Sequence, residues 1–308
     1  MSRIHEALKK AAQERSTWIS SETTPDFVDV LTAVSRTTVR AEDQSLPLLG
    51  DLAPEQKSPF LCFEELVKKC AHPQWQLDPR NNVFLGADSN QIGAENFRTL
   101  RSRLYQIAGT RPLKRILVTS SIAEEGKTFI AANLAQSIVR QDQRRVLLID
   151  ADLRLPRLHQ VLGAPVTPGL TEYLRGEADE MAVIQRGLEG NLCFIPSGGP
   201  VSNPSELLLG ERMKHLLELV TPIFDWVVLD SPPALPVHDA SMLADLCDGV
   251  LFVVRAGQTD FELAERAASE FREKNLLGVV LNRVQNGDTY GCNYYGYNSG
   301  KDSGTKPK

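Results

Sequence analysis

The segment TSSIAEEGKT, residues 119–128, contains residue types that could hold a phosphate group. It lies between an apolar run and a helical pattern, where successive backbone N–H groups and a helix N-terminus form a concave site for phosphate oxygens. In such a loop Lys127 would reach the β- and γ-phosphates of ATP, and the Thr128 hydroxyl would bind Mg²⁺. Gly126 has no Cβ, so the backbone could approach the phosphates closely.

Two residues of this segment bear on how well it could hold a phosphate group. Ser121 stands where the first glycine is expected, and Glu124 places a carboxylate beside the phosphate site. If the Glu124 side chain faces the γ-phosphate, a repulsion of roughly 1–4 kcal/mol is expected at intermediate dielectric. If it points to solvent, nothing is lost. The sequence leaves both orientations open.

Aspartates follow two apolar runs that read as strands. Asp150 and Asp152 belong to VLLIDADLR, and Asp230 belongs to VVLDSPP. Carboxylates at the ends of strands that flank a phosphate loop are where Mg²⁺ and its waters are held. The predicted catalytic residues are Lys127, Asp150, Asp152 and Asp230, and the predicted metal ligands are Thr128, Asp152 and Asp230.

The elements that must position these side chains alternate between strands and helices. The strands are short and continuously apolar, which indicates burial on both faces of a mostly parallel sheet that is covered by helices. With the phosphate loop, this predicts an α/β P-loop NTPase fold with its ligand at the carboxyl ends of the strands. Strands are expected at 115–119, 145–149, 192–195, 226–229, 250–254 and 277–281, and helices at 127–140, 204–220, 239–246 and 260–273.

The chain divides into four parts that differ in composition and hydrophobic periodicity. Residues 1–15 read as an amphipathic helix, which could pack on its own domain or dock on a partner or an anionic membrane surface. Residues 16–90 are proline-rich and linker-like, with one short helix near residues 60–69. Residues 91–286 form the expected P-loop α/β domain, and residues 287–308 form a tail without core-forming periodicity.

Bulk properties exclude several classes of protein. The formal net charge of −5 gives no reason to expect a nucleic-acid partner, whose binding surface would be basic. The charged N-terminus lacks the apolar core of a signal peptide, and no apolar run approaches the ~18 residues that cross a bilayer. We therefore expect a cytoplasmic protein, soluble or peripheral to the membrane.

Four of the six tyrosines fall close together in the tail. They are separated by glycine and asparagine, so a flexible segment could enter an active site in several registers. The cluster is either a multiply phosphorylated substrate or a low-complexity tail without function. The candidate phosphorylation sites are Tyr290, Tyr294, Tyr295 and Tyr297.

Together, EGKT, LLIDADLR and VVLDSPP resemble the motifs of the bacterial tyrosine kinases that regulate capsule and exopolysaccharide synthesis. The family's hydrophobic-D-x-D-x-R motif is matched by Asp150, Asp152 and Arg154, and its hydrophobic-D-S/T-P-P motif begins at Asp230. The resemblance covers about residues 90–297. It also includes an E-x-x-R-x-x-R helix, formed here by Glu95, Arg98 and Arg101.

The resemblance implies an ATP- and Mg²⁺-dependent kinase that phosphorylates its own tail tyrosines, on an adjacent subunit of a ring-like, ATP-dependent homo-oligomer. Glu95, Arg98 and Arg101 would contact the neighbouring subunit. It also implies a tyrosine phosphatase and a separate transmembrane activator of the polysaccharide chain-length (co-polymerase) family, which would hold the chain at the inner face of the plasma membrane. The implied nucleotide-binding residues are Ser121, Glu125, Gly126, Lys127, Thr128, Phe129 and, at the adenine, Asn282.

Two alternative functions have to be compared with the kinase. The related ParA/MinD ATPases carry a signature lysine five residues before the loop lysine, and here that position is Ile122, which argues against them. A second alternative is a nucleotide-binding scaffold, weak or inactive as a kinase because of Glu124, that regulates assembly through oligomerisation.

Overall fold

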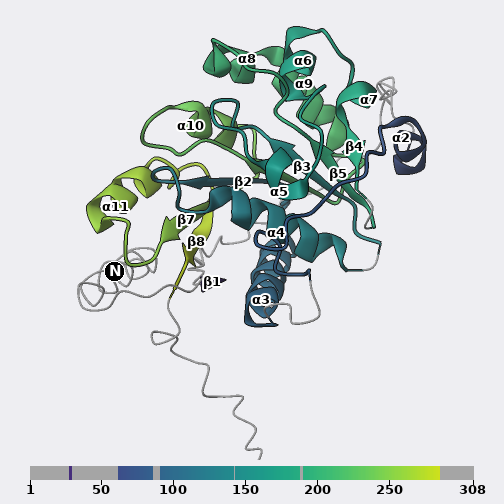
Figure 1. The fold of residues 1–308 in the computed structure, drawn as a ribbon. Coiled ribbons are helices and arrows are strands. Elements are labelled where there is room, and N and C mark those ends of the chain that lie inside the picture. Colours follow the sequence, from purple (N-terminus) through teal and green to yellow (C-terminus); the bar gives the residue numbers. More distant parts are fainter. Residues whose placement is uncertain (1–27, 30–61, 86–90, 142, 188–189, 285–308) are drawn as a thin grey trace, which may run out of the picture.

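The computed structural model describes residues 28–29, 62–85, 91–141, 143–187 and 190–284. They form one eight-stranded sheet with the order β1-β8-β7-β2-β6-β3-β5-β4, covered by helices on both faces (Figure 1). The six central strands are parallel, and the two-residue strands β1 (Val28–Asp29) and β4 (Gln185–Arg186) pair antiparallel at the edges. The parallel strands are β2 (Arg115–Ser120), β3 (Val146–Asp150), β5 (Leu192–Ile195), β6 (Trp226–Asp230), β7 (Gly249–Arg255) and β8 (Leu276–Asn282).

All six predicted strands are therefore confirmed, as is the α/β class. Their side chains alternate between two cores. Leu117 and Leu229 face one core, while Ile116, Val118 and Val228 face the other. Burial on both sheet faces explains why these strands read as continuous apolar runs rather than as alternating ones.

The helices form two layers. Helices α3, α4 and α5 share one core, and α2, α6, α8, α9, α10 and α11 share the other. The predicted helix at 204–220 is two helices, because Gly210 adopts an extended conformation between them. The bounds are α2 (Phe63–Lys69), α3 (Gln91–Ala108), α4 (Lys127–Val139), α5 (Leu158–Leu162), α6 (Leu170–Arg175), α7 (Glu180–Val183), α8 (Pro204–Leu209), α9 (Glu211–Val220), α10 (Asp239–Ala244) and α11 (Phe261–Ser269).

Residues 62–85 contain the short helix that we predicted near residues 60–69, which is α2, but the rest of this segment packs more closely than the linker that we predicted. Phe63 and Leu66 of α2 are buried in one core, and Trp75 is buried in the other, with its ring edge-on to Phe194 at 5.9 Å. The burial of Trp75 was not predicted, because its contact with Phe194 joins residues far apart in the chain. The segment packs against the α/β domain rather than connecting to it loosely.

A pair of asparagines ties the same segment to α4. Asn82 donates from Nδ2 to Gln136 Oε1 at 2.6 Å, and Asn133 Oδ1 accepts from the Val83 backbone N–H at 2.9 Å.

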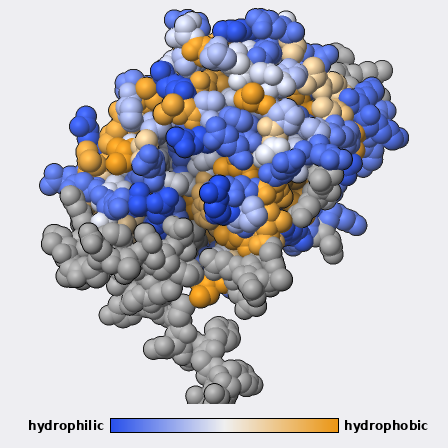
Figure 2. Space-filling model, in the orientation of Figure 1, coloured by the Kyte–Doolittle hydropathy of each residue, from blue (hydrophilic) through white to orange (hydrophobic). Residues whose placement is uncertain are grey.

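Figure 2 shows mostly hydrophilic side chains on the upper part of the molecule and an apolar area over α3 and α4. The predicted helix over residues 1–15 and the tail at 287–308 lie outside the described residues.

Candidate active site

Three adjacent strands bring the predicted site residues to one edge of the sheet. β6 lies between β2 and β3, so the phosphate loop after β2 and the aspartates after β3 and β6 are neighbours. Asp230 is the register partner of Val118 on one side and of Asp150 on the other. Two carboxylates therefore stand side by side at the carboxyl ends of the strands, as predicted.

Lys127 begins α4 and points its amine at these carboxylates. Its Nζ donates to Asp152 Oδ2 at 2.8 Å, and the two side chains are only 12% and 3% exposed. Burial opposes the ammonium charge, but Asp230, Asp152 and Asp150 together outweigh it and raise the pKa of Lys127. Gly126 before it has a φ of 96°, a left-handed conformation that glycine adopts at no steric cost.

Asp150 holds the backbone of the segment that follows β3. Its Oδ1 accepts from the Asp152 N–H at 3.3 Å, and its Oδ2 accepts from the Leu158 N–H at the start of α5 at 3.1 Å. Burial raises the pKa of Asp150 well above its usual value, and the neighbouring Asp230 and Asp152 charges raise it further. Asp150 therefore shapes the loop that carries Asp152.

Asp230 is fully buried, and neither of its oxygens has a hydrogen-bond partner of good geometry among the described residues. Burial raises its pKa, although Lys127 and the nearby Thr128 hydroxyl oppose this effect. A buried carboxylate without a partner is costly unless a ligand supplies one. Its two free oxygens beside the Thr128 hydroxyl fit a hard cation such as Mg²⁺.

No three acidic, histidine or cysteine side chains in the described part of the chain converge closely enough to enclose a metal ion by themselves. Mg²⁺ is commonly held by one or two carboxylates together with water and substrate phosphates.

The buried Glu125 carboxylate stabilises the phosphate loop through hydrogen bonds. Its Oε2 accepts from the Ile122 N–H at 2.8 Å, and its Oε1 accepts from the Thr259 hydroxyl at 2.5 Å and from the Arg255 N–H at 3.4 Å. Burial raises the pKa of Glu125. Arg255 ends β7 and Thr259 follows that strand, so their contact with the loop depends on a part of the chain about 130 residues away.

Asn282, at the end of β8, also contacts the loop. Its Nδ2 donates to the Glu125 carbonyl at 2.8 Å, and a Cβ on Gly126 would overlap with the same amide. Its Oδ1 accepts from the Arg283 N–H. Its predicted contact with adenine stays a prediction, as do the predicted nucleotide contacts of Ser121, which is buried, and Phe129, which is half-buried.

Glu124 is exposed to solvent and has a φ of 68°. This left-handed conformation costs a residue with a Cβ about 1–2 kcal/mol. The strain, rather than the charge, distinguishes this position in the fold.

Glu124→Gly is expected to raise the free energy of unfolding by up to about 1 kcal/mol, because relief of the strain is partly offset by the entropy of glycine in the unfolded chain. Glu124→Ala removes the same charge and keeps the Cβ, so it should give no such gain. Urea unfolding of both variants measures the difference. Since the carboxylate is exposed, both should bind Mg²⁺-ATP with an affinity within about threefold of wild type. An increase of tenfold or more in both variants would instead show that the carboxylate opposes the γ-phosphate.

Arg154, the last residue of the D-x-D-x-R motif, links three elements. Its Nε donates to Asp239 Oδ2 of α10 at 2.8 Å, and one Nη donates to Ser205 Oγ of α8 at 2.8 Å. The Ser205 hydroxyl in turn donates to Asp239 Oδ1 at 2.6 Å. Burial opposes ionisation of Asp239, yet these hydrogen bonds hold its pKa below its usual value.

Arg154→Gln is expected to lower the free energy of unfolding by about 1–3 kcal/mol at pH 7, because Asp239 is 1% exposed and would lose its cation, while Arg154 itself is 36% exposed. A depressed carboxyl pKa contributes stability above the unfolded pKa, near 4, and loses it as the pH falls through the folded pKa. The difference from wild type should therefore shrink below about pH 4. Arg157→Gln, which changes an exposed arginine nearby, is the control. An equal loss of stability in both variants would contradict the role given to the ion pair between Arg154 and Asp239.

The predicted oligomerisation residues lie on α3. Arg98 and Glu95 form an exposed ion pair at 2.9 Å, while Arg101 turns inward and donates to the Ser137 carbonyl of α4. Their role between subunits stays a prediction. The tyrosine cluster at Tyr290, Tyr294, Tyr295 and Tyr297 lies outside the described residues.

The fold and the loop define the class of protein. Residues 116–294 match the CobQ/CobB/MinD/ParA nucleotide binding domain family. The chain is thus a P-loop nucleotide-binding protein.

Full-length relatives narrow this class. The chain is 34% identical over 221 residues to tyrosine-protein kinase YwqD of Bacillus subtilis, which covers 70% of this chain and 92% of YwqD. It is 34% identical over 208 residues to tyrosine-protein kinase etk of Escherichia coli K12, but spans only 28% of that protein. The solved kinase domain of E. coli ETK aligns with a TM-score of 0.63 and 31% identity, covering 73% of this chain and 88% of the domain. The chain belongs to the bacterial tyrosine kinase family.

Proposed function

We propose that the chain is a protein-tyrosine kinase that transfers the γ-phosphoryl group of ATP to its own tail tyrosines. The observation that carries the proposal is the buried Lys127 among three carboxylates beside a phosphate loop, in a chain whose relatives are named tyrosine-protein kinases. The proposed acceptors are Tyr290, Tyr294, Tyr295 and Tyr297. We further propose that this kinase serves exopolysaccharide synthesis and export, since one relative is named the succinoglycan biosynthesis transport protein ExoP of Rhizobium meliloti.

The phosphate loop and Lys127 would bind the phosphates of ATP. Phosphoryl transfer depends mostly on positioning and on neutralising charge. Lys127 would leave Asp152 and turn its amine to the β- and γ-phosphates. Thr128 and Asp230 would hold Mg²⁺, which neutralises charge on the phosphates. The free Asp230 oxygens support this assignment.

The ion pair between Lys127 and Asp152 suggests how the tyrosine proton is removed. Once Lys127 turns to the phosphates, the Asp152 carboxylate loses its partner and can accept the phenol proton. The tyrosine oxygen then forms a bond to the γ-phosphorus as the bond to ADP breaks. Asp150 would not accept the proton, since both its oxygens are bonded to backbone N–H groups.

Two exposed apolar side chains offer a contact for the tyrosine ring. Ile122 belongs to the phosphate loop, and Leu155, which is 64% exposed, follows the D-x-D segment. The Leu155 N–H donates to Asp152 Oδ1 at 3.0 Å, so Leu155 adjoins the proposed base. An apolar rim beside a base suits a phenol substrate better than a charged one.

The proposed setting is the inner face of the membrane. None of the described helices is long and apolar enough to cross a bilayer. We propose that a separate transmembrane co-polymerase activates the chain, that it assembles as an ATP-dependent ring through Glu95, Arg98 and Arg101, and that a tyrosine phosphatase reverses the modification.

Mass spectrometry of the tail tests the activity. The full chain would be treated with a phosphatase and then incubated with Mg²⁺-ATP, with and without the cytoplasmic segment of the candidate activator. Phosphate should appear on the four tail tyrosines, and a variant with all four changed to phenylalanine should take up none. An unmodified tail in a protein that binds ATP, even with the activator segment, would favour the nucleotide-binding scaffold.

A further inference from the structure

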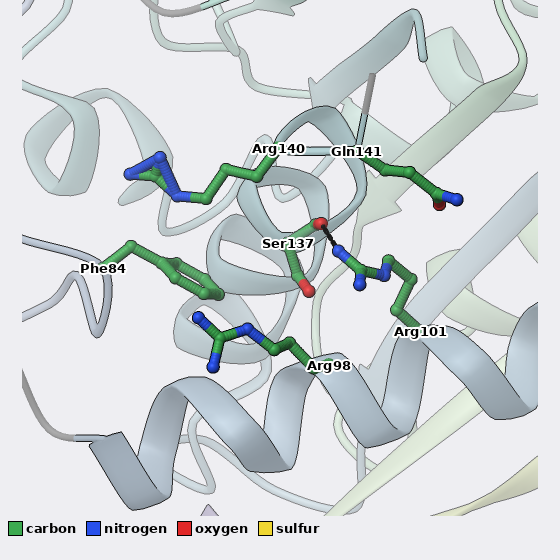
Figure 3. A pocket seen from close by; sticks show the side chains of 6 residues that line it. All are labelled: Phe84, Arg98, Arg101, Ser137, Arg140 and Gln141. Atoms are coloured by element: carbon green, nitrogen blue, oxygen red, sulfur yellow. Dashed lines mark hydrogen bonds between the residues drawn. The ribbon is translucent and has the colours of Figure 1, made fainter. Parts of the chain in front are cut away.

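A cavity of about 380 Å³ lies between α3 and α4, away from the phosphate loop. Arginine side chains dominate its lining, and none of the lining residues is acidic. Figure 3 shows the guanidinium groups of Arg98, Arg101 and Arg140 around the space, with the Phe84 ring at one side. The lining consists of Phe84, Arg98, Arg101, Ser137, Arg140 and Gln141.

The cavity is distinct from the proposed ATP site. Lys127 begins α4, whereas Ser137 and Arg140 lie at its other end. At 1.5 Å per residue, the 13 residues between Lys127 and Arg140 separate them by about 20 Å. A nucleotide on the phosphate loop therefore does not fill this cavity.

The C-terminal end of a helix ordinarily repels anions, because its free carbonyls carry partial negative charge. Here Arg101 donates to the Ser137 carbonyl and so neutralises part of that charge. The buried Ser137 hydroxyl has no hydrogen-bond partner in the described part of the chain, and it points toward Arg98 on α3 (Figure 3). An unpartnered buried donor among guanidinium groups calls for a ligand with acceptor oxygens.

Phe84 adds an aromatic wall. The Arg140 guanidinium lies 4.9 Å from the ring centroid, a cation–π contact that holds both side chains in place. Guanidinium groups bind phosphate oxygens through paired N–H donors, and an aromatic ring packs well against another ring. The combination suits a phosphate that is attached to an aryl group.

We infer that this cavity binds an aryl phosphate monoester, the side chain of phosphotyrosine, from a phosphorylated tail of this chain. Arg98 would leave its exposed ion pair with Glu95 and the subunit contact proposed for it, and would bind the phosphate oxygens together with Arg140. The Ser137 hydroxyl would donate a further hydrogen bond, and Phe84 would pack against the ring. The source of the ligand rests on the proposed tyrosine kinase activity, but the binding chemistry does not.

A synthetic phosphopeptide tests the binding chemistry of the cavity separately from the proposed kinase activity. The peptide covers residues 289–299 with Cys292 replaced by serine and phosphate on Tyr295, and its binding to the phosphatase-treated full chain is followed by fluorescence anisotropy in saturating ADP, which occupies the phosphate loop. We expect the phosphopeptide to bind at least about tenfold more tightly than the same peptide without phosphate. Because the phosphate is made synthetically, an inactive kinase would not affect the result.

Matched variants identify the site. Arg98→Gln and Arg140→Gln should each weaken binding about tenfold or more, whereas Arg272→Gln, an exposed arginine of similar charge, should stay within twofold. Phe84→Leu should remove the preference for phosphopeptide over inorganic phosphate. Equal binding with and without phosphate, an unchanged affinity in both arginine variants, or competition by inorganic phosphate as strong as by phosphopeptide would each overturn the inference.

Discussion

Lys127→Met is expected to reduce tail phosphorylation by about 10³-fold or more. The structure places the Lys127 ammonium among Asp150, Asp152 and Asp230, and we propose that it neutralises the transferred phosphoryl group. Loss of a single preorganised donor or cation at such a site costs about 10²–10⁵ in rate. The measurement is the initial rate of phosphate incorporation into the tail, by quantitative mass spectrometry, at saturating Mg²⁺-ATP.

Two controls make this result specific. Lys69→Met removes an exposed lysine of α2 and should leave the rate within twofold. The folding of Lys127→Met must be checked by its unfolding curve, because three carboxylates lose their shared cation and the free energy of unfolding at pH 7 should fall. A rate in Lys127→Met above about a tenth of wild type would contradict the role proposed for the lysine.

The sheet and the acidic residues were predictable because local signals determine them. Runs such as VLLID and VVLD are apolar because both of their faces are buried, and each ends in aspartate at the carboxyl edge. The order of strands was not needed to expect Asp150 and Asp230 near Lys127. It was enough that parallel strands present their carboxyl ends together.

The support of the loop was not predictable, since it depends on pairs that are distant in the sequence. Glu125 bonds Thr259, Asn282 bonds the Glu125 carbonyl, and Arg154 bonds Asp239. Thr259 and Asp239 have ordinary local contexts. Glu125, Asn282 and Arg154 belong to predicted motifs, but only the packing of the layers shows which residues they contact. The burial of Trp75 was missed for the same reason.

Glu124 illustrates a different limit. The sequence shows a carboxylate in the phosphate loop. Whether this carboxylate repels the γ-phosphate depends on the orientation of its side chain, which the sequence does not give. The structure shows an exposed side chain on a left-handed backbone. Glu124 therefore affects the conformation of the loop more than its electrostatics.

Asp230→Asn is expected to stabilise the nucleotide-free protein while it lowers phosphorylation by about 10²-fold or more. The buried Asp230 carboxylate has no hydrogen-bond partner of good geometry among the residues that the structure describes, and its pKa is raised chiefly by burial. A carboxyl group whose folded pKa is raised destabilises the fold as the pH increases above its unfolded pKa, near 4. The amide has no charge to bury, so the variant should gain about 1–3 kcal/mol at pH 7.

The stability difference between Asp230→Asn and wild type should depend on pH. Near pH 4 the wild-type carboxyl is protonated, so variant and wild type should unfold at similar urea concentrations. The gap should open as the pH rises toward 7. Asp225→Asn, which changes a half-buried aspartate that Arg145 already pairs at 3.5 Å, should show a loss of stability instead.

The same substitution tests the metal assignment. An amide is a weaker ligand for Mg²⁺ than a carboxylate, so the rise in melting temperature that Mg²⁺-ATP gives to wild type should be much smaller in Asp230→Asn. A variant that is more stable without ligand yet gains less from Mg²⁺-ATP would mean that this carboxylate is kept for binding at a cost to folding. If it gained as much as wild type, the ligands of the metal would have to be sought at Asp152 instead.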